Sequence, residues 1–105
     1  MSQCITVVQF ATPPRSKQDA ISAAENSAPT YRDLAPAGLV RKDFLNGESG
    51  GGGVYLWDER ASAEAWFTPE RIADLTQRFG VHPTIVYYDT YVTVDNVAGE
   101  TRIAR

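Results

Sequence analysis

The sequence predicts an α+β domain of the ferredoxin-like class, in which two helices cover one face of a four-stranded antiparallel sheet. β-Branched and aromatic runs alternate with helical periodicity in the order β-α-β-β-α-β. A glycine-rich segment, and not a helix, joins the second and third strands. A chain of 105 residues suits a single domain with one modest core, taken as residues 1–105.

The first strand is expected over residues 4–10, a short β-branched run that two prolines end. A helix should follow, because Ser16 is a suitable N-cap and the acidic Asp19 lies three residues later. Apolar residues at helical spacing then mark one face: Ile21, Ala24, Ala28, Tyr31 and Ala35. Pro29 lies within this pattern and should kink or split the helix, since it removes one helical hydrogen bond.

The second and third strands are expected over residues 38–46 and 54–57, with glycines between them. A phosphate-binding loop would join a strand to a helix N-terminus and would carry a Lys and a Ser or Thr, which this segment lacks. The glycines therefore indicate a hairpin connection that runs into a strand, where glycine marks a bulge or a close approach. A flexible loop that gates a pocket is the alternative.

Asp58 can cap a second helical region, which should end at Gly80. Thr68 followed by Pro69 suggests that a separate helical piece starts there. Residues 84–95 are β-branched and aromatic almost throughout and predict the longest strand. The tail, residues 97–105, is expected to be loose.

Composition argues against several partners. The net charge is −3 and the basic residues are scattered, so nucleic acid is not expected. No apolar run approaches the roughly 20 residues that a membrane span needs. Cys4 and His82 are the only residues of their types, so neither a zinc site of the usual kind nor an internal disulfide is expected. The lone cysteine and the lack of a signal-peptide pattern predict a cytoplasmic protein.

Short motifs in a consistent order resemble the YdhR-like monooxygenases of the dimeric α+β barrel superfamily. They are Gly38-Leu39, Lys42 with Phe44, the run "GGVYLW" followed by Asp58, Trp66, and the ending "V-x-V-D-N". The resemblance covers about residues 4–96. It implies a homodimer whose sheets pack face to face, with a small apolar cavity between sheet and helices in each subunit.

The last strand supports a dimer independently of the resemblance. It carries apolar residues on both faces, and the two helices can cover only one of them. The resemblance also bears on cofactors. Haem-degrading relatives carry a His ligand about ten residues after the helical Trp, where this chain has Thr76, so haem is not expected. By analogy with other relatives, no metal, flavin or haem would be needed.

Lys42 is the most specific pocket candidate. By strand alternation it shares a face with Val40 and Phe44, and on a cavity wall its ammonium would pair with an anionic ligand. The alternative is a solvated charge. The other candidates, for which core packing or an exposed position is the competing interpretation, are Gln9, Phe44, Trp57, Trp66, Tyr87 and His82.

The expected function is a cofactor-independent monooxygenase that acts on a small electron-rich aromatic or enolic compound. The alternative is a dimeric binding protein that holds a small apolar ligand without turning it over. No catalytic residue can be named, because the single His has no visible nucleophile and no pair of carboxylates stands out.

Overall fold

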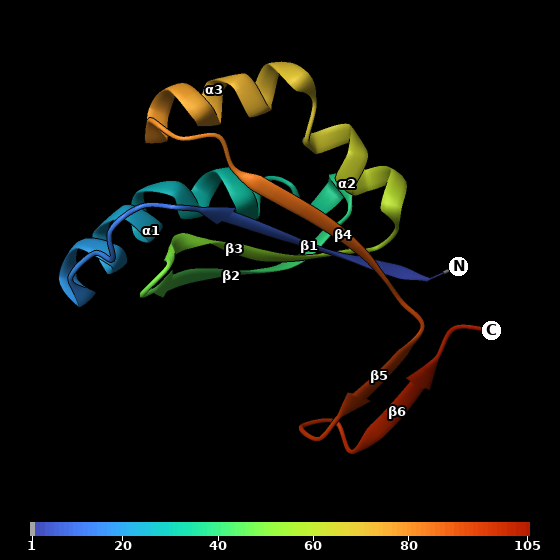
Figure 1. Ribbon diagram of the computed structural model, residues 1–105. Coiled ribbons are helices and arrows are strands. Elements are labelled where there is room, and N and C mark those ends of the chain that lie inside the picture. Colours follow the sequence, from blue (N-terminus) through green and yellow to red (C-terminus); the bar gives the residue numbers. More distant parts are fainter. Residues whose placement is uncertain (1) are drawn as a thin grey trace.

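The computed structural model describes residues 2–105 and forms an α+β fold in which helices cover one face of a sheet (Figure 1). The elements are β1 Gln3–Phe10, α1 Lys17–Arg32, a 3-10 turn Ala35–Ala37, β2 Leu39–Gly47, β3 Gly50–Trp57, α2 Arg60–Trp66, α3 Pro69–Phe79, β4 Thr84–Thr90, β5 Val92–Asp95 and β6 Glu100–Ile103. The larger sheet has the strand order β2-β3-β1-β4, and each neighbouring pair is antiparallel. This arrangement is compatible with the ferredoxin-like class that the sequence predicts.

The first helix begins as predicted but is not split at Pro29. The Ser16 hydroxyl accepts a hydrogen bond from the amide of Asp19 at 3.1 Å and so caps the helix. Pro29 removes one hydrogen bond only, and its own carbonyl still accepts from the amide of Asp33 at 3.0 Å, so α1 runs on to Arg32.

The second helical region is two helices, as the Thr68-Pro69 pair predicts. The Thr68 hydroxyl accepts from the amide of Arg71 at 3.2 Å, and Pro69 is the first residue of α3. The expected cap at the start of α2 is wrong by one residue. Glu59 holds the N-cap position, and the Asp58 carboxylate instead accepts a hydrogen bond from the Ser62 hydroxyl.

The core lies between the helices and the central strands. Alternate residues of β1 are buried on the helical face of the sheet, opposite Tyr55 and Trp57 of β3. The Trp57 indole nitrogen donates to the Thr6 hydroxyl at 3.0 Å, which satisfies both buried polar groups. The buried apolar residues are Cys4, Val8, Phe10, Leu39, Tyr55, Trp57, Ala63 and Phe67.

The C-terminal segment differs from the prediction. The expected strand over residues 84–95 breaks at Tyr91, so that β4 stays in the main sheet and β5 leaves it. The tail expected to be loose, residues 97–105, contains β6, which pairs antiparallel with β5. Figure 1 shows this hairpin projecting from the main body.

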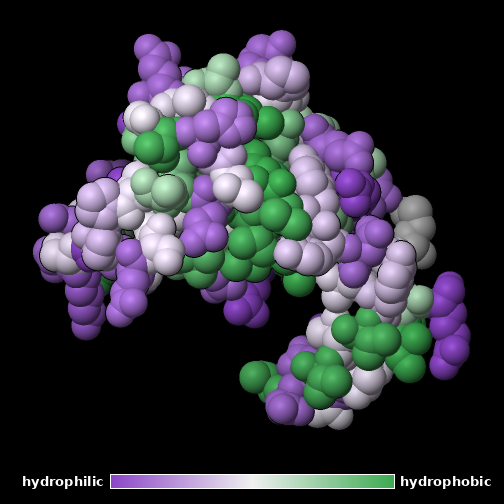
Figure 2. Space-filling view, viewed as in Figure 1, coloured by the Kyte–Doolittle hydropathy of each residue, from purple (hydrophilic) through white to green (hydrophobic). Residues whose placement is uncertain are grey.

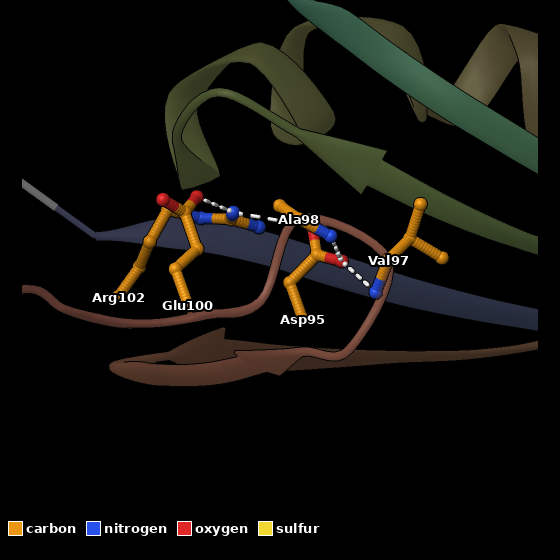
Figure 3. A network of polar contacts seen from close by, with 5 residues as sticks. All are labelled: Asp95, Val97, Ala98, Glu100 and Arg102. Carbon is orange, nitrogen blue, oxygen red and sulfur yellow. Dashed lines mark hydrogen bonds and ion pairs between the residues drawn. The ribbon is translucent and has the colours of Figure 1, made fainter.

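One carboxylate organises the turn between β5 and β6 (Figure 3). An Asp95 oxygen accepts from the amides of Val97 and Ala98, each at 3.0 Å. Arg102 pairs with Asp95 at 3.3 Å and with Glu100 at 2.5 Å. The amide of Ala98 and then Arg102 are the main causes that lower the pKa of Asp95. This local network explains why the segment is ordered although it is short.

Candidate functional site

A cavity of about 500 Å³ lies between the helical face of the sheet and helices α1 and α3. Its wall comes from β1, the loop after β1, α1, β2, β3 and α3. The described wall residues include Lys42, Arg15 and Arg78 but no Asp, Glu or His. The charged groups of the wall are therefore all basic, although the whole chain has a net charge of −3.

The Lys42 amine lies within a cage of three aromatic rings. Its Nζ is 3.3 Å from the ring centroid of Tyr31, 4.2 Å from that of Phe44 and 4.5 Å from that of Tyr55. The Tyr31 ring is steeply inclined to the other two, at 77° to Phe44 and 73° to Tyr55, with centroid distances of 5.7 Å and 5.8 Å. All three π faces can attract the ammonium form electrostatically.

The strand register places these groups together. In the antiparallel pair of β2 and β3, Lys42 lies opposite Tyr55, and Phe44 lies opposite Gly53. A Cβ at Gly53 would be 2.8 Å from Cε of Lys42, so the missing side chain leaves room for the lysine stem. Tyr31 reaches the cage from α1, on the other side of the cavity.

Burial lowers the pKa of Lys42 to about 7, because the low-polarity surroundings disfavour its charged form. Lys42 forms no ion pair with any of residues 2–105, so no nearby carboxylate offsets this effect. Burial, followed by the neighbouring Tyr31, raises the pKa of Tyr55, so that phenol stays protonated. Near neutral pH the cavity thus holds a titratable amine beside a phenolic hydroxyl.

The far end of the cavity is formed by Arg15, Asn46, Arg78 and Phe79. The Asn46 amide fixes the loop after β1, accepting from the amide of Arg15 at 3.0 Å and donating to its carbonyl at 2.9 Å. The guanidinium groups of Arg15 and Arg78 lie 5.9 Å and 6.0 Å from the Phe79 ring centroid. Asn46 follows Lys42 by four positions along the extended strand, which is about 13 Å.

Two of the seven predicted pocket residues, Lys42 and Phe44, line this cavity. Trp57 does not, because it is fully buried in the core against Thr6. Trp66 borders a smaller depression of about 150 Å³, and the Arg71 guanidinium stacks on its ring at 3.3 Å. Neither tryptophan therefore belongs to the wall of the larger cavity.

The other three predicted residues also lie outside the cavity. Gln9 is exposed on the opposite face of the sheet, because inward residues of β1 have even numbers. Tyr87 packs against Phe67 with a centroid distance of 6.4 Å, and Arg60 lies 4.9 Å from its ring. His82 is exposed in the connection between α3 and β4.

Sequence reasoning missed several residues of the site, notably Tyr55, Gly53 and Asn46. Tyr55 lies two positions before the buried Trp57, so strand alternation alone places it on the helical face. Its pairing with Lys42 depends on the length of the turn between β2 and β3, which the run of glycines obscured. Tyr31 was correctly placed on the apolar face of the first helix, but nothing in its spacing indicates a contact with Lys42.

Among the described residues, no helix is both long and apolar enough to cross a membrane. Within residues 2–105, no three His, Cys, Asp or Glu side chains are grouped in a way that would hold a metal ion. Compared with known proteins, the chain matches no family model, and no curated protein matches it significantly.

Proposed function

We propose that the protein binds a small electron-rich phenol or enol as its anion in this cavity and transfers oxygen to it without a metal, flavin or haem. The observation that carries the proposal is the position of the Lys42 amine. It lies among three aromatic rings that can bind a cation, and Lys42 and these rings line the same cavity. The resemblance to the YdhR-like monooxygenases supplies the reaction class.

The shape and charge of the cavity support a ligand of this kind. A volume of about 500 Å³ lies within the usual range for small-molecule sites. Aromatic walls favour a planar ligand. The Arg15 and Arg78 guanidinium groups and the lack of any carboxylate among the described wall residues favour an anion.

The chemistry would use the electrons of the ligand itself. The anion passes one electron to dioxygen, and the two resulting radicals combine to form a carbon–oxygen bond. The peroxide anion so formed takes up one proton. If the attacked carbon still carries a hydrogen, the hydroperoxide loses that hydrogen together with its terminal OH as water and leaves a carbonyl, so one oxygen atom stays on the product. The protein would contribute positioning and stabilisation of the anion.

The proposal includes a homodimer in which a second copy covers the open face of the sheet. The central strands present mostly apolar residues on that face although no helix covers it, and Tyr88 is 54% exposed there. The charged pair Arg41 and Asp43 lies at its β2 edge. Its apolar residues are Ile5, Val7, Val54, Leu56, Val86 and Tyr88. Figure 2 shows further hydrophobic residues on the projecting β5–β6 hairpin, where Val94 is 67% exposed. Two such faces would bury on the order of 2,000 Å².

A binding protein without catalysis is the second candidate, and one observation favours it. The described wall residues include none of the His or carboxylate side chains that usually act as general bases. The cytoplasmic location predicted from the lone Cys4 belongs to both candidates.

Oxygen uptake separates the two functions. Purified protein is incubated with a panel of hydroxylated aromatic and enolic compounds, and dioxygen is followed with an electrode. An oxygenase consumes dioxygen with at least one compound. Lys42→Met loses this activity, while Lys17→Met, at the exposed start of α1, keeps it. Binding by calorimetry without any uptake across the panel would favour the binding protein.

A further inference from the structure

The proposed reaction needs the ligand as an anion, and a phenol or enol entering from water near neutral pH carries its proton. That proton must either pass to a group in the cavity or leave to solvent when the ligand binds. The described wall residues offer no carboxylate and no imidazole. Arg15 and Arg78 are permanently protonated guanidinium groups and cannot accept one.

Lys42 is the remaining candidate, because a neutral amine has a lone pair that accepts a proton. Its nitrogen lines the cavity, is paired with no carboxylate of residues 2–105, and is desolvated by its surroundings. The same surroundings favour the product of the transfer. Once the ammonium forms, the faces of Tyr31, Phe44 and Tyr55 attract it from 3.3 to 4.5 Å.

We propose that the neutral amine of Lys42 is the general base that removes the hydroxyl proton of the ligand and then stays beside the anion as its counter-ion. The ligand O–H bond breaks, its electron pair remains on oxygen, and a new N–H bond forms on Nζ. No proton enters or leaves the cavity, and its net charge does not change. This inference rests on the proposed function for its ligand class, but the proton transfer does not depend on the later step with dioxygen.

The groups that face Lys42 set its pH dependence. Tyr31 projects from α1, Tyr55 from β3 and Phe44 from its own strand, while Arg15 and Arg78 carry the other charges of the cavity. Burial lowers the pKa of Lys42 to about 7, so above that pH the amine is neutral and binding moves a proton within the complex. Below about pH 7 the amine is already protonated, and formation of the same complex must release one proton to solvent.

The probe is 2-naphthol, a weakly acidic phenol whose anion has its own absorption band. Wild-type protein is titrated with 2-naphthol near pH 8. Calorimetry in two buffers of different ionisation enthalpy gives the number of protons that the complex takes up or releases on binding. We expect bound naphtholate with close to zero net proton exchange. Lys42→Arg keeps a cation that cannot act as a base, so it should bind naphtholate with release of one proton.

Two further variants complete the test. Lys42→Met should bind neutral naphthol, with affinity reduced about tenfold or more, which corresponds to about 1.4 kcal/mol. Lys17→Met removes an exposed charge at the start of α1, outside the cavity, and should behave like the wild type. Because Lys42→Arg keeps the charge and length of the side chain, it remains informative if the methionine variant folds poorly.

Three results would overturn the inference: release of one proton by the wild type near pH 8, a bound ligand with the neutral spectrum, or no binding of 2-naphthol. The oxygen-uptake experiment tests the oxygenase independently of the proton transfer. Naphtholate formed without any uptake across the panel would retire the oxygenase and leave Lys42 as the base. Uptake that persists unchanged in Lys42→Met would keep the oxygenase and refute the base.

Discussion

At the scale of single residues, Gly53 and Lys42 depend on each other. The lysine stem crosses the strand at the place where glycine has no side chain, and this brings the amine among the rings. Strand alternation was enough to predict that Lys42 and Phe44 share a face. It could not predict the cage, because Tyr31 arrives from a helix whose position over the sheet is a tertiary property.

Gly53→Ala should therefore move the amine out of the cage. The new Cβ would lie 2.8 Å from Cε of Lys42, and the flexible lysine can shift more easily than the strand. With the amine returned toward water, its pKa should rise from about 7 toward the usual value of 10.5. The chain contains only two lysines, Lys17 and Lys42, so their ¹³Cε signals can be titrated by NMR and told apart. An unchanged Lys42 titration would show that Gly53 does not control the amine.

Lys42 should also make stability depend on pH. Its pKa is 10.5 in the unfolded chain and about 7 in the folded protein. Between these values the unfolded chain binds more protons, so the free energy of unfolding rises with pH across this window. Lys42→Met removes the cost of burying an ammonium and should be more stable than the wild type near pH 6, by on the order of 2 kcal/mol. The difference should disappear toward about pH 10.5.

Urea unfolding of both proteins at a fixed protomer concentration checks this pH dependence. Arg41→Met is the control, because its ion pair with Asp43 is exposed and should contribute little at any pH. A difference between Lys42→Met and the wild type that stays constant from acidic to alkaline pH would contradict burial of the amine.

At the scale of elements, the glycine run forms the start of β3, and its positions need glycine for two different reasons. Gly50 and Gly52 have φ values of +124° and +153°, and a Cβ on either would overlap a carbonyl oxygen of β1. Gly53 instead makes room for a side chain. The sequence predicted a hairpin with close approaches here and not a phosphate loop, and the structure confirms the hairpin.

Gly52→Ala should consequently destabilise the fold by about 3 kcal/mol, because both its backbone angle and the Val8 carbonyl oppose a side chain. Gly47→Ala is the matched control, since its Cβ would lie 3.7 Å from the nearest atom, the carbonyl oxygen of Gly50. We expect that variant to stay within about 0.5 kcal/mol of the wild type. Thermal unfolding followed by circular dichroism measures both. Equal midpoints for the two variants would show that the strand can relax around Gly52.

The C-terminal hairpin marks the limit of element prediction from sequence. Residues 84–95 have uniform strand propensity, and propensity does not say which partner a strand pairs with. The signal for the turn was present, because Asp95 and Gly99 are typical turn residues that flank the reversal. Val92 and Val94 of β5 are 57% and 67% exposed, so the proposed dimer would have apolar side chains to cover there.

At the scale of the whole molecule, the sheet has one covered and one open face. Tyr88→Glu tests the proposed dimer, because Tyr88 is 54% exposed in the protomer, and a charge there should spare the fold of a single chain. In a face-to-face dimer the same change would bury an unpaired carboxylate and should weaken association by at least a hundredfold. Sedimentation equilibrium at micromolar concentration measures this, and Ala73→Glu on the exposed side of α3 is the control. A wild-type monomer would remove the dimer from the proposal.

The proposed ligand and the proposed second subunit would contact opposite faces of the same sheet. In β1, Val8 lines the cavity while its neighbour Val7 lies on the opposite face, and in β3 the same is true of Gly53 and Val54. A ligand that shifts these strands would then alter subunit affinity, and by thermodynamic reciprocity the dimer would bind that ligand with a different affinity from the monomer. Saturating 2-naphthol should change the dimer dissociation constant of the wild type, and Lys42→Met, which binds the probe weakly, should show a smaller change at the same concentration. The sheet would in that case act as a sensor, because ligand binding in the cavity on one face would change dimer formation on the other.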